Sequence, residues 1–207
     1  MGIMELVRQG GWLMAPIGAL SVIAGAIFLE RLWRFQKTKL VPDGFLRALI
    51  ALLSDKQNAQ AIQLTHQNDS VLARIMRESL PHRHLTRTEL KERMGEYGEN
   101  ELATLERRLG VLSTIATISP LMGLLGTITG MIRVFRQISA ELDPAVSSLA
   151  GGIWEALLTT AAGLVVAIPA YVGHQYLIGL LELRSQELTE ACQTVLNVIQ
   201  ETGADES

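Results

Sequence analysis

Two long apolar segments stand out in the second half of the chain. They are Leu109–Ile132 and Ala156–Leu181, and neither contains Asp, Glu, Lys or Arg. Because about 20 apolar residues suffice for a helix to cross a bilayer, each segment is long enough to span a membrane. Small and hydroxylated residues recur in both at helical spacing, which is typical of helices that pack closely against neighbours. We therefore predict two packed transmembrane helices.

A third apolar segment, Gly11–Leu29, lies near the start of the chain. A cleaved signal peptide carries its cations before the apolar stretch. Here the cluster of cations follows the stretch, at Arg31, Arg34, Lys37 and Lys39. We therefore interpret this segment as a retained transmembrane helix.

The polar region between the first two apolar segments predicts helices without strands. The breaks at Pro42-Asp43, Ser54-Asp55 and Asn68-Asp69-Ser70 are each expected to start a helix. Thr86 followed by Glu89 has the pattern of a capping box, which predicts the start of a fourth helix.

Two of the transmembrane helices are expected to continue beyond the membrane. A leucine stripe leads from the fourth polar helix into the second span, at Leu102, Leu105, Leu109 and Leu112. A similar stripe continues past the third span, at Leu181, Leu188, Cys192, Val195 and Ile199. Such periodicity indicates continuous amphipathic helices. The predicted fold is thus all-α: a polytopic membrane protein with three transmembrane helices, of which the second and third extend into a cytoplasmic helical bundle.

The distribution of cations predicts the topology. Of 18 Lys and Arg residues, 14 lie between Arg31 and Arg108, and the positive-inside rule places that region in the cytoplasm. The predicted division is a short periplasmic N-terminus (1–10), transmembrane helix one (11–31), a cytoplasmic helical domain (32–108), transmembrane helix two (109–134), a periplasmic loop (135–153), transmembrane helix three (154–181) and a cytoplasmic C-terminal helix and tail (182–207).

Composition argues against several function classes. No basic patch with interleaved aromatic residues occurs, so nucleic acid is not an expected partner. The single cysteine, Cys192, excludes a disulfide within the chain. His82 and His84 lack Cys or carboxylate partners at ligand spacing and are interpreted as loop residues. No catalytic motif is present, and we predict neither an enzyme nor a metal or cofactor site.

Small residues dominate one face of each of the later spans. In the second span this face carries Pro120, Gly123, Thr127 and Gly130, and Gly123, Gly126 and Gly130 allow another backbone to approach closely. The third span has a stripe of Ala156, Thr160, Gly163, Ala167, Ala170 and His174. Either a bulky partner or a water-filled path is expected against that stripe.

Four residues near or within the spans are candidates for polar roles. The hydroxyls of Thr127 and Thr160 either line a polar path or bond to a carbonyl of their own helix. Glu155 is either an interfacial carboxylate favoured by the helix dipole or a group that attracts cations to a pore entrance or pairs with a partner cation. Pro169 is expected to kink the third helix and to free a backbone carbonyl near Val165.

The spans lack an acid that could carry protons. Since Gly11–Leu29, Leu109–Ile132 and Ala156–Leu181 contain no Asp or Glu, a proton-conducting role requires that another chain supply the ionisable group.

Two stretches resemble the MotA/TolQ/ExbB proton-channel family. They are ISPLMGLLGTITGMI (Ile118–Ile132) and GGIWEALLTTAAGLVVAIPA (Gly151–Ala170). By this resemblance Thr127 and Thr160 match the family's pore-facing threonines, and Glu155 matches its glutamate in helix three. His174 and Gln175 stand where relatives often carry tyrosine and asparagine. Thr129 occupies the place of a tryptophan common in TolQ-like chains, which favours the ExbB-like branch.

The resemblance also implies a setting. ExbB-like chains lie in the bacterial inner membrane with a periplasmic N-terminus and a cytoplasmic C-terminus, and they form a homo-oligomeric ring, described as a pentamer. The ring surrounds a dimer of single-span ExbD-like subunits that supply the membrane aspartate, and work passes to a TonB-like protein for transport across the outer membrane. The alternatives are a TolQ-like motor for envelope maintenance and a membrane scaffold that does not conduct.

Overall fold

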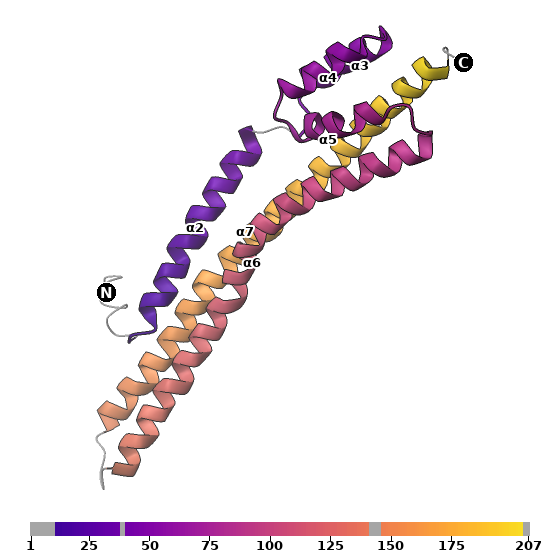
Figure 1. Ribbon diagram of the computed structural model, residues 1–207. Coiled ribbons are helices and arrows are strands. Elements are labelled where there is room, and N and C mark those ends of the chain that lie inside the picture. Colours follow the sequence, from indigo (N-terminus) through magenta and orange to yellow (C-terminus); the bar gives the residue numbers. More distant parts are fainter. Residues whose placement is uncertain (1–10, 38–39, 141–145, 205–207) are drawn as a thin grey trace. The chain divides into compact units, whose positions relative to one another are not determined.

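The computed structural model describes residues 11–37, 40–140 and 146–204, and these residues are largely helical and contain no strand. The all-α prediction is confirmed. The helices are α2 (Met14–Lys37), α3 (Asp43–Ser54), α4 (Asn58–His66), α5 (Val71–Ser79), the 3₁₀ turn η1 (Leu80–His82), α6 (Arg87–Ala140) and α7 (Val146–Ala204) (Figure 1).

The chain divides into two compact units, which we name the span unit and the bundle unit. The span unit comprises Met1–Leu32 and Leu109–Leu177, and the bundle unit comprises Trp33–Arg108 and Ile178–Ser207. Because α6 and α7 are continuous, each contributes one part to each unit.

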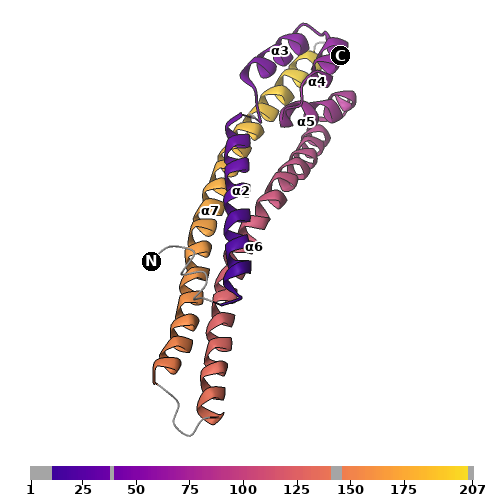
Figure 2. The same cartoon turned by 90° about the vertical axis from the view of Figure 1, so that its left-hand side faces the viewer.

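Within the described residues, three helices, α2, α6 and α7, are long and apolar enough to cross a membrane. This agrees with the three predicted spans. In the span unit, α6 and α7 run side by side in opposite directions, as the two views of Figures 1 and 2 show.

Helices α6 and α7 also continue past the apolar segments, as the leucine stripes predict. At the other end, α6 reaches Ala140 and α7 begins at Val146, so helix occupies most of the interval 135–153 for which a loop is predicted. No Gly or Pro interrupts the sequence between Arg133 and Ala140, and a helix has no local reason to end there. The predicted N-terminal segment, 1–10, and residues 141–145 of the loop lie outside the described residues.

One predicted helix start in the bundle unit is wrong. Helix α3 begins at Asp43 as predicted, but it continues through Ser54, and Asp55 is its C-cap. Lys56 then adopts a left-handed φ of 57°, and α4 begins only at Asn58. Ser54-Asp55 therefore ends a helix, because the left-handed residue turns the chain before the next one begins.

The other two predicted helix starts are confirmed by their caps. The Ser70 hydroxyl accepts a hydrogen bond from the Ala73 amide at 3.2 Å at the start of α5. At α6 the Thr86 amide donates to the Glu89 carboxylate at 3.0 Å, and the Glu89 amide donates back to the Thr86 hydroxyl at 3.4 Å. The Thr86 hydroxyl also donates to the Glu89 carboxylate at 2.7 Å, and this bond, together with the one from the Thr86 amide, lowers the pKa of Glu89.

The bundle unit has its own apolar core. Leu49 of α3, Leu72 and Met76 of α5, Leu90 of α6 and Val195 of α7 are all fully buried in it. Arg74 of α5 and Glu101 of α6 form an ion pair at 2.6 Å beside this core, and the hydrogen bond between them raises the pKa of Arg74. The α7 stripe predicted from Leu188, Val195 and Ile199 is buried in the same core.

Candidate functional site

The span unit is held together by close backbone contact between α6 and α7. We name this contact the glycine seam, and it is formed by Gly123, Gly126 and Gly130 of α6 and Gly163 of α7. A Cβ at Gly123 would lie 2.9 Å from the Thr160 Cα, and one at Gly130 would lie 2.7 Å from the Ala156 Cβ. Such distances leave no room for a side chain, so these positions require glycine.

The small residues of α7 are covered within the chain. A Cβ at Gly163 would lie 2.5 Å from the Ser119 carbonyl oxygen, and Ala156 is buried at Gly130. Further along α7, Ala170 packs with Ala24 of α2 and Ile115 of α6. At Ala156, Gly163 and Ala170 the expectation of a bulky partner or a water-filled path is therefore corrected, because other helices of the same chain fill the space there.

The two predicted threonines differ in their hydrogen bonds. The Thr160 hydroxyl donates across the seam to the Gly123 carbonyl at 2.8 Å. The Thr127 hydroxyl donates to the Leu124 carbonyl of its own helix at 2.7 Å, which is the second of the two alternatives that the sequence leaves open. Both side chains are half-buried. Thr160 thus joins two helices, whereas Thr127 does not.

Two polar residues of the seam, Thr159 and Ser119, are not predicted from the sequence. Thr159 is buried against Gly126, and its hydroxyl donates to the Glu155 and Ala156 carbonyls at 2.9 Å each. Ser119 is fully buried, and its hydroxyl has no hydrogen-bond partner among the residues that the structure describes. Their spacing could have predicted their burial, because Ser119 lies four residues before Gly123 and Thr159 lies three residues after Ala156. Both positions are therefore on the packed face of their helix.

The carboxylate of Glu155 is paired within the chain. It accepts a hydrogen bond from the Arg133 guanidinium of α6 at 2.7 Å. It also packs against the backbone of Gly11, where an added Cβ would collide with it. A cation for Glu155 is therefore present within the chain, in α6, and the ion pair links the two helices beside the seam.

Both prolines lie inside continuous helices, Pro120 in α6 and Pro169 in α7. Helix α7 continues through Pro169, so that residue does not end the helix. Proline cannot donate to the carbonyl four residues before it, which for Pro169 is the carbonyl of Val165. That this carbonyl faces a polar path remains a prediction.

The arrangement can orient a proton but not hold one. A hydroxyl both donates and accepts hydrogen bonds, so the half-buried Thr127 and Thr160 can align water or an acidic group. A carrier must ionise, and the α6 and α7 spans contain no carboxylate between Leu109 and Ile132 or between Ala156 and Leu181. Among the described residues no cluster of three His, Cys, Asp or Glu side chains could hold a metal.

Comparison with known proteins gives a consistent set of relatives. Residues 64–190 match the model of the MotA/TolQ/ExbB proton channel family. An ExbB-like biopolymer transport protein of Synechocystis sp. is 34% identical over 90% of this chain and 73% of its own length. The biopolymer transport protein exbB1 of Vibrio cholerae is 32% identical over 84% of this chain and 78% of its own length. The Tol-Pal system protein TolQ of Haemophilus influenzae is 40% identical over 37% of this chain and 34% of its own length.

Proposed function

Because the chain belongs to the MotA/TolQ/ExbB proton channel family, we propose that it is an ExbB-like subunit of an inner-membrane motor driven by the proton-motive force. In this proposal the chain forms a homo-oligomeric ring, a pentamer, around a dimer of single-span ExbD-like partners. Proton flow moves the partner within the ring, and the motion reaches a TonB-like protein that drives transport across the outer membrane.

Two features together support the proposal. Helices α6 and α7 form a hairpin that is packed at glycines and carries hydroxyls, and the membrane spans of these helices contain no acid. A seam that brings Thr160 onto the backbone of α6 makes a firm wall with hydroxyls along it. The missing carboxylate then has to come from another chain, as an ExbD-like span with a membrane aspartate provides.

Protons that cross the membrane release enough free energy for mechanical work. Each elementary charge that crosses 100 mV releases about 2.3 kcal/mol. A few protons per cycle therefore supply enough to break and remake contacts between the ring and its partner, which are worth several kcal/mol. The glycine seam keeps each hairpin together while those contacts change.

We assign Glu155 and Arg133 to the entrance of the path. Their ion pair offers a carboxylate to approaching cations and a guanidinium that limits its net charge. In this role the pair tunes the entrance rather than acting as an unpaired acid.

A TolQ-like motor is the second candidate, because a TolQ relative matches part of the chain at 40% identity. The two candidates share the conduction chemistry and differ in the partner. Co-purification with an ExbD-like or a TolR-like subunit from the native membrane separates them.

Proton uptake into proteoliposomes tests the conduction step. The chain and its ExbD-like partner are reconstituted together, and uptake is measured under an imposed potential. We expect Thr160→Val and neutralisation of the partner's membrane aspartate to abolish uptake, since each removes a polar group of the path. Thr160→Ser keeps the hydroxyl and should retain uptake.

Thr114→Val is the matched control, because Thr114 lies outside the seam and, among the described residues, its hydroxyl bonds to the Gly110 carbonyl of its own helix. Co-purification of the partner with each variant separates loss of conduction from loss of assembly. Uptake that survives both the Thr160→Val change and the aspartate change contradicts the proposed path. A non-conducting scaffold predicts that all variants behave like wild type.

A further inference from the structure

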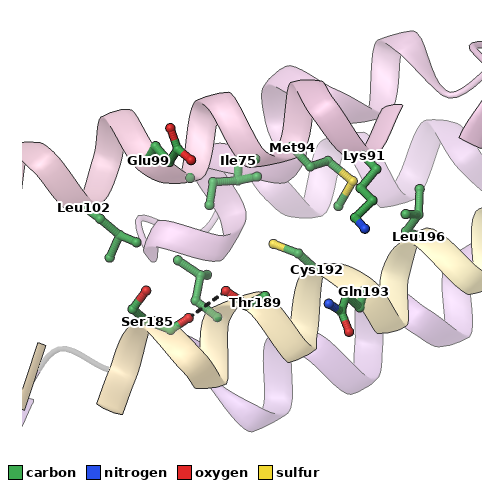
Figure 3. Close-up of a pocket in the computed structure, with 13 residues that line it drawn as sticks. Ile75, Lys91, Met94, Glu99, Leu102, Ser185, Thr189, Cys192, Gln193 and Leu196 are labelled. Atoms are coloured by element: carbon green, nitrogen blue, oxygen red, sulfur yellow. Dashed lines mark hydrogen bonds between the residues drawn. The ribbon is translucent and has the colours of Figure 1, made fainter. Parts of the chain in front are cut away.

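The bundle unit contains a cavity of about 360 Å³ between α5, α6 and α7. Its walls are mainly apolar and include Ile75, Met94, Leu102, Leu188, Cys192 and Leu196 (Figure 3). An apolar cavity of roughly 150 Å³ is already large enough to bind benzene, and ligand pockets begin at about 300 Å³. This cavity is therefore large enough for a small apolar ligand.

Two glycines of α6 keep the cavity open. Glycine inside a helix costs about 1 kcal/mol relative to alanine, so Gly95 and Gly98 weaken α6. A Cβ at Gly95 would meet no atom within 4 Å, and one at Gly98 would only touch the Ile75 Cδ1 at 3.7 Å. Unlike the glycines of the seam, neither is required by contacts within the chain. A side chain at either position would instead take up space in the cavity.

The charged side chains at the cavity place a cation at one of its ends. Lys91 and Glu99 both line it and lie about two turns apart on α6. The Lys91 amine turns toward α7 beside Gln193, whereas the Glu99 carboxylate turns away from the gap (Figure 3). Within the described part of the chain, Lys91 has no ion-pair partner. A ligand thus meets an unpaired cation at one end.

The Thr189 hydroxyl and the Cys192 thiol add no charge to the wall of the cavity. The Thr189 hydroxyl already donates to the Ser185 carbonyl at 3.0 Å. Burial raises the pKa of the Cys192 thiol to about 12, so at neutral pH it is an uncharged part of the apolar wall. The surface between Lys91 and Leu102 therefore suits an alkyl chain.

We propose that this cavity binds a free medium-chain fatty acid, with its alkyl chain against the apolar wall and its carboxylate at Lys91. A volume of about 360 Å³ lies near the lower end of ligand-pocket volumes, which suits a single alkyl chain of medium length. A two-chain phospholipid is too large. The proposal concerns the bundle unit and does not depend on proton conduction.

Photolabelling of the full chain in phospholipid nanodiscs tests the site. The probe is a twelve-carbon fatty acid with a diazirine near its methyl end, and labelled peptides are mapped by mass spectrometry. We expect labelling in the peptides that contain Leu102 and Ser185, which lie at the end of the cavity away from Lys91 (Figure 3). Laurate should compete with the probe, and dodecanol, which has the same chain without the charge, should compete roughly three- to tenfold more weakly.

Two pairs of variants make the test specific. Lys91→Gln should weaken competition by laurate by a similar factor, whereas Arg93→Gln, an exposed cation of the same helix outside the cavity, should not. Gly95→Leu fills the cavity and should abolish labelling, whereas Gly95→Ala removes the helix penalty with little filling and should retain it. Cys192→Phe is a second filling variant should Gly95→Leu not fold.

Three results overturn the proposal. The first is a wild-type chain without label at these peptides, as expected if a second copy of the chain fills the space. The second is labelling that both filling variants retain. The third is equal competition by laurate and dodecanol, which would remove the role of Lys91.

Discussion

At the scale of single residues, a hydroxyl in the seam can serve packing and chemistry together. Thr160 uses its only proton to bond the Gly123 carbonyl. Its oxygen lone pairs remain able to accept a hydrogen bond from water or from a partner's acid. Thr127 spends its proton within α6 and leaves its lone pairs similarly free. The Thr160 hydroxyl therefore links two helices and the Thr127 hydroxyl does not, although both can line a path.

Replacement of each threonine by valine separates these roles. Thr160→Val removes a bond between helices and should lower the free energy of unfolding by about 0.6–1.7 kcal/mol. Thr127→Val removes only a bond within one turn and should leave stability nearly unchanged. Thermal unfolding of the purified chain in detergent compares the two. Equal losses would mean that the bond to Gly123 does not hold the helices.

Cys192 should react slowly with thiol reagents. Burial raises its pKa to about 12, so at pH 8 far less of it is present as thiolate than for an ordinary exposed cysteine. Maleimide labelling followed by mass spectrometry should show this difference between the native chain and the chain in denaturant. The native rate should still rise about tenfold per pH unit through pH 10, because the thiol stays below its pKa. A native rate close to the denatured one would contradict the burial of the thiol.

At the scale of elements, the two long helices use glycine for opposite purposes. In the seam, glycine lets α6 and α7 touch backbone to backbone. In the bundle unit, Gly95 and Gly98 leave space unfilled between the same two helices at the cavity. The same residue type therefore marks contact in one unit and space in the other, and sequence spacing alone does not distinguish the two.

A methyl group added to the seam should disturb the hairpin. At Gly163 the new Cβ would lie 2.5 Å from the Ser119 carbonyl oxygen, and the helices must separate to admit it. We expect Gly163→Ala to destabilise the chain by about 1–3 kcal/mol, as overpacking does. Gly25→Ala in α2 is the control, because its Cβ meets nothing within 4 Å. Thermal unfolding should show a lower midpoint for the first variant and an unchanged or higher one for the second.

At the scale of the whole molecule, the chain contains two units with separate cores that share two helices. Each unit can therefore lose packing without direct loss in the other. For the proposed motor subunit this division matters, because the proposed ligand of the bundle unit and the proposed proton path of the span unit involve different parts of α6 and α7.

A cavity in the bundle core tests this division. Leu72→Ala removes a fully buried side chain and should cost about 2–5 kcal/mol. Hydrogen exchange measured by mass spectrometry should rise in residues 40–108 and 178–204 and stay unchanged in residues 109–177. The matched control is Leu52→Ala, because the Leu52 side chain is only partly buried at the edge of the same core. Faster exchange throughout 109–177 would show that the units unfold together.

The sequence by itself determined the features that depend on local pattern. The three apolar segments, the continuity of α6 and α7 past them, and the caps at Ser70 and Thr86 each follow from composition and periodicity over a few turns. Ser54-Asp55 was the exception, because a helix end and a helix start use similar polar residues.

Only the tertiary structure decided how the helices are rotated and how closely they approach. That geometry selects Thr160 rather than Thr127 to bond across the seam and buries Thr159 and Ser119. It also pairs Glu155 with Arg133, 22 residues away, and leaves a cavity beside Gly95. Contacts between helices depend on positions distant along the chain. The helical period shows which residues of one helix share a face, but it does not show which face of another helix packs against them.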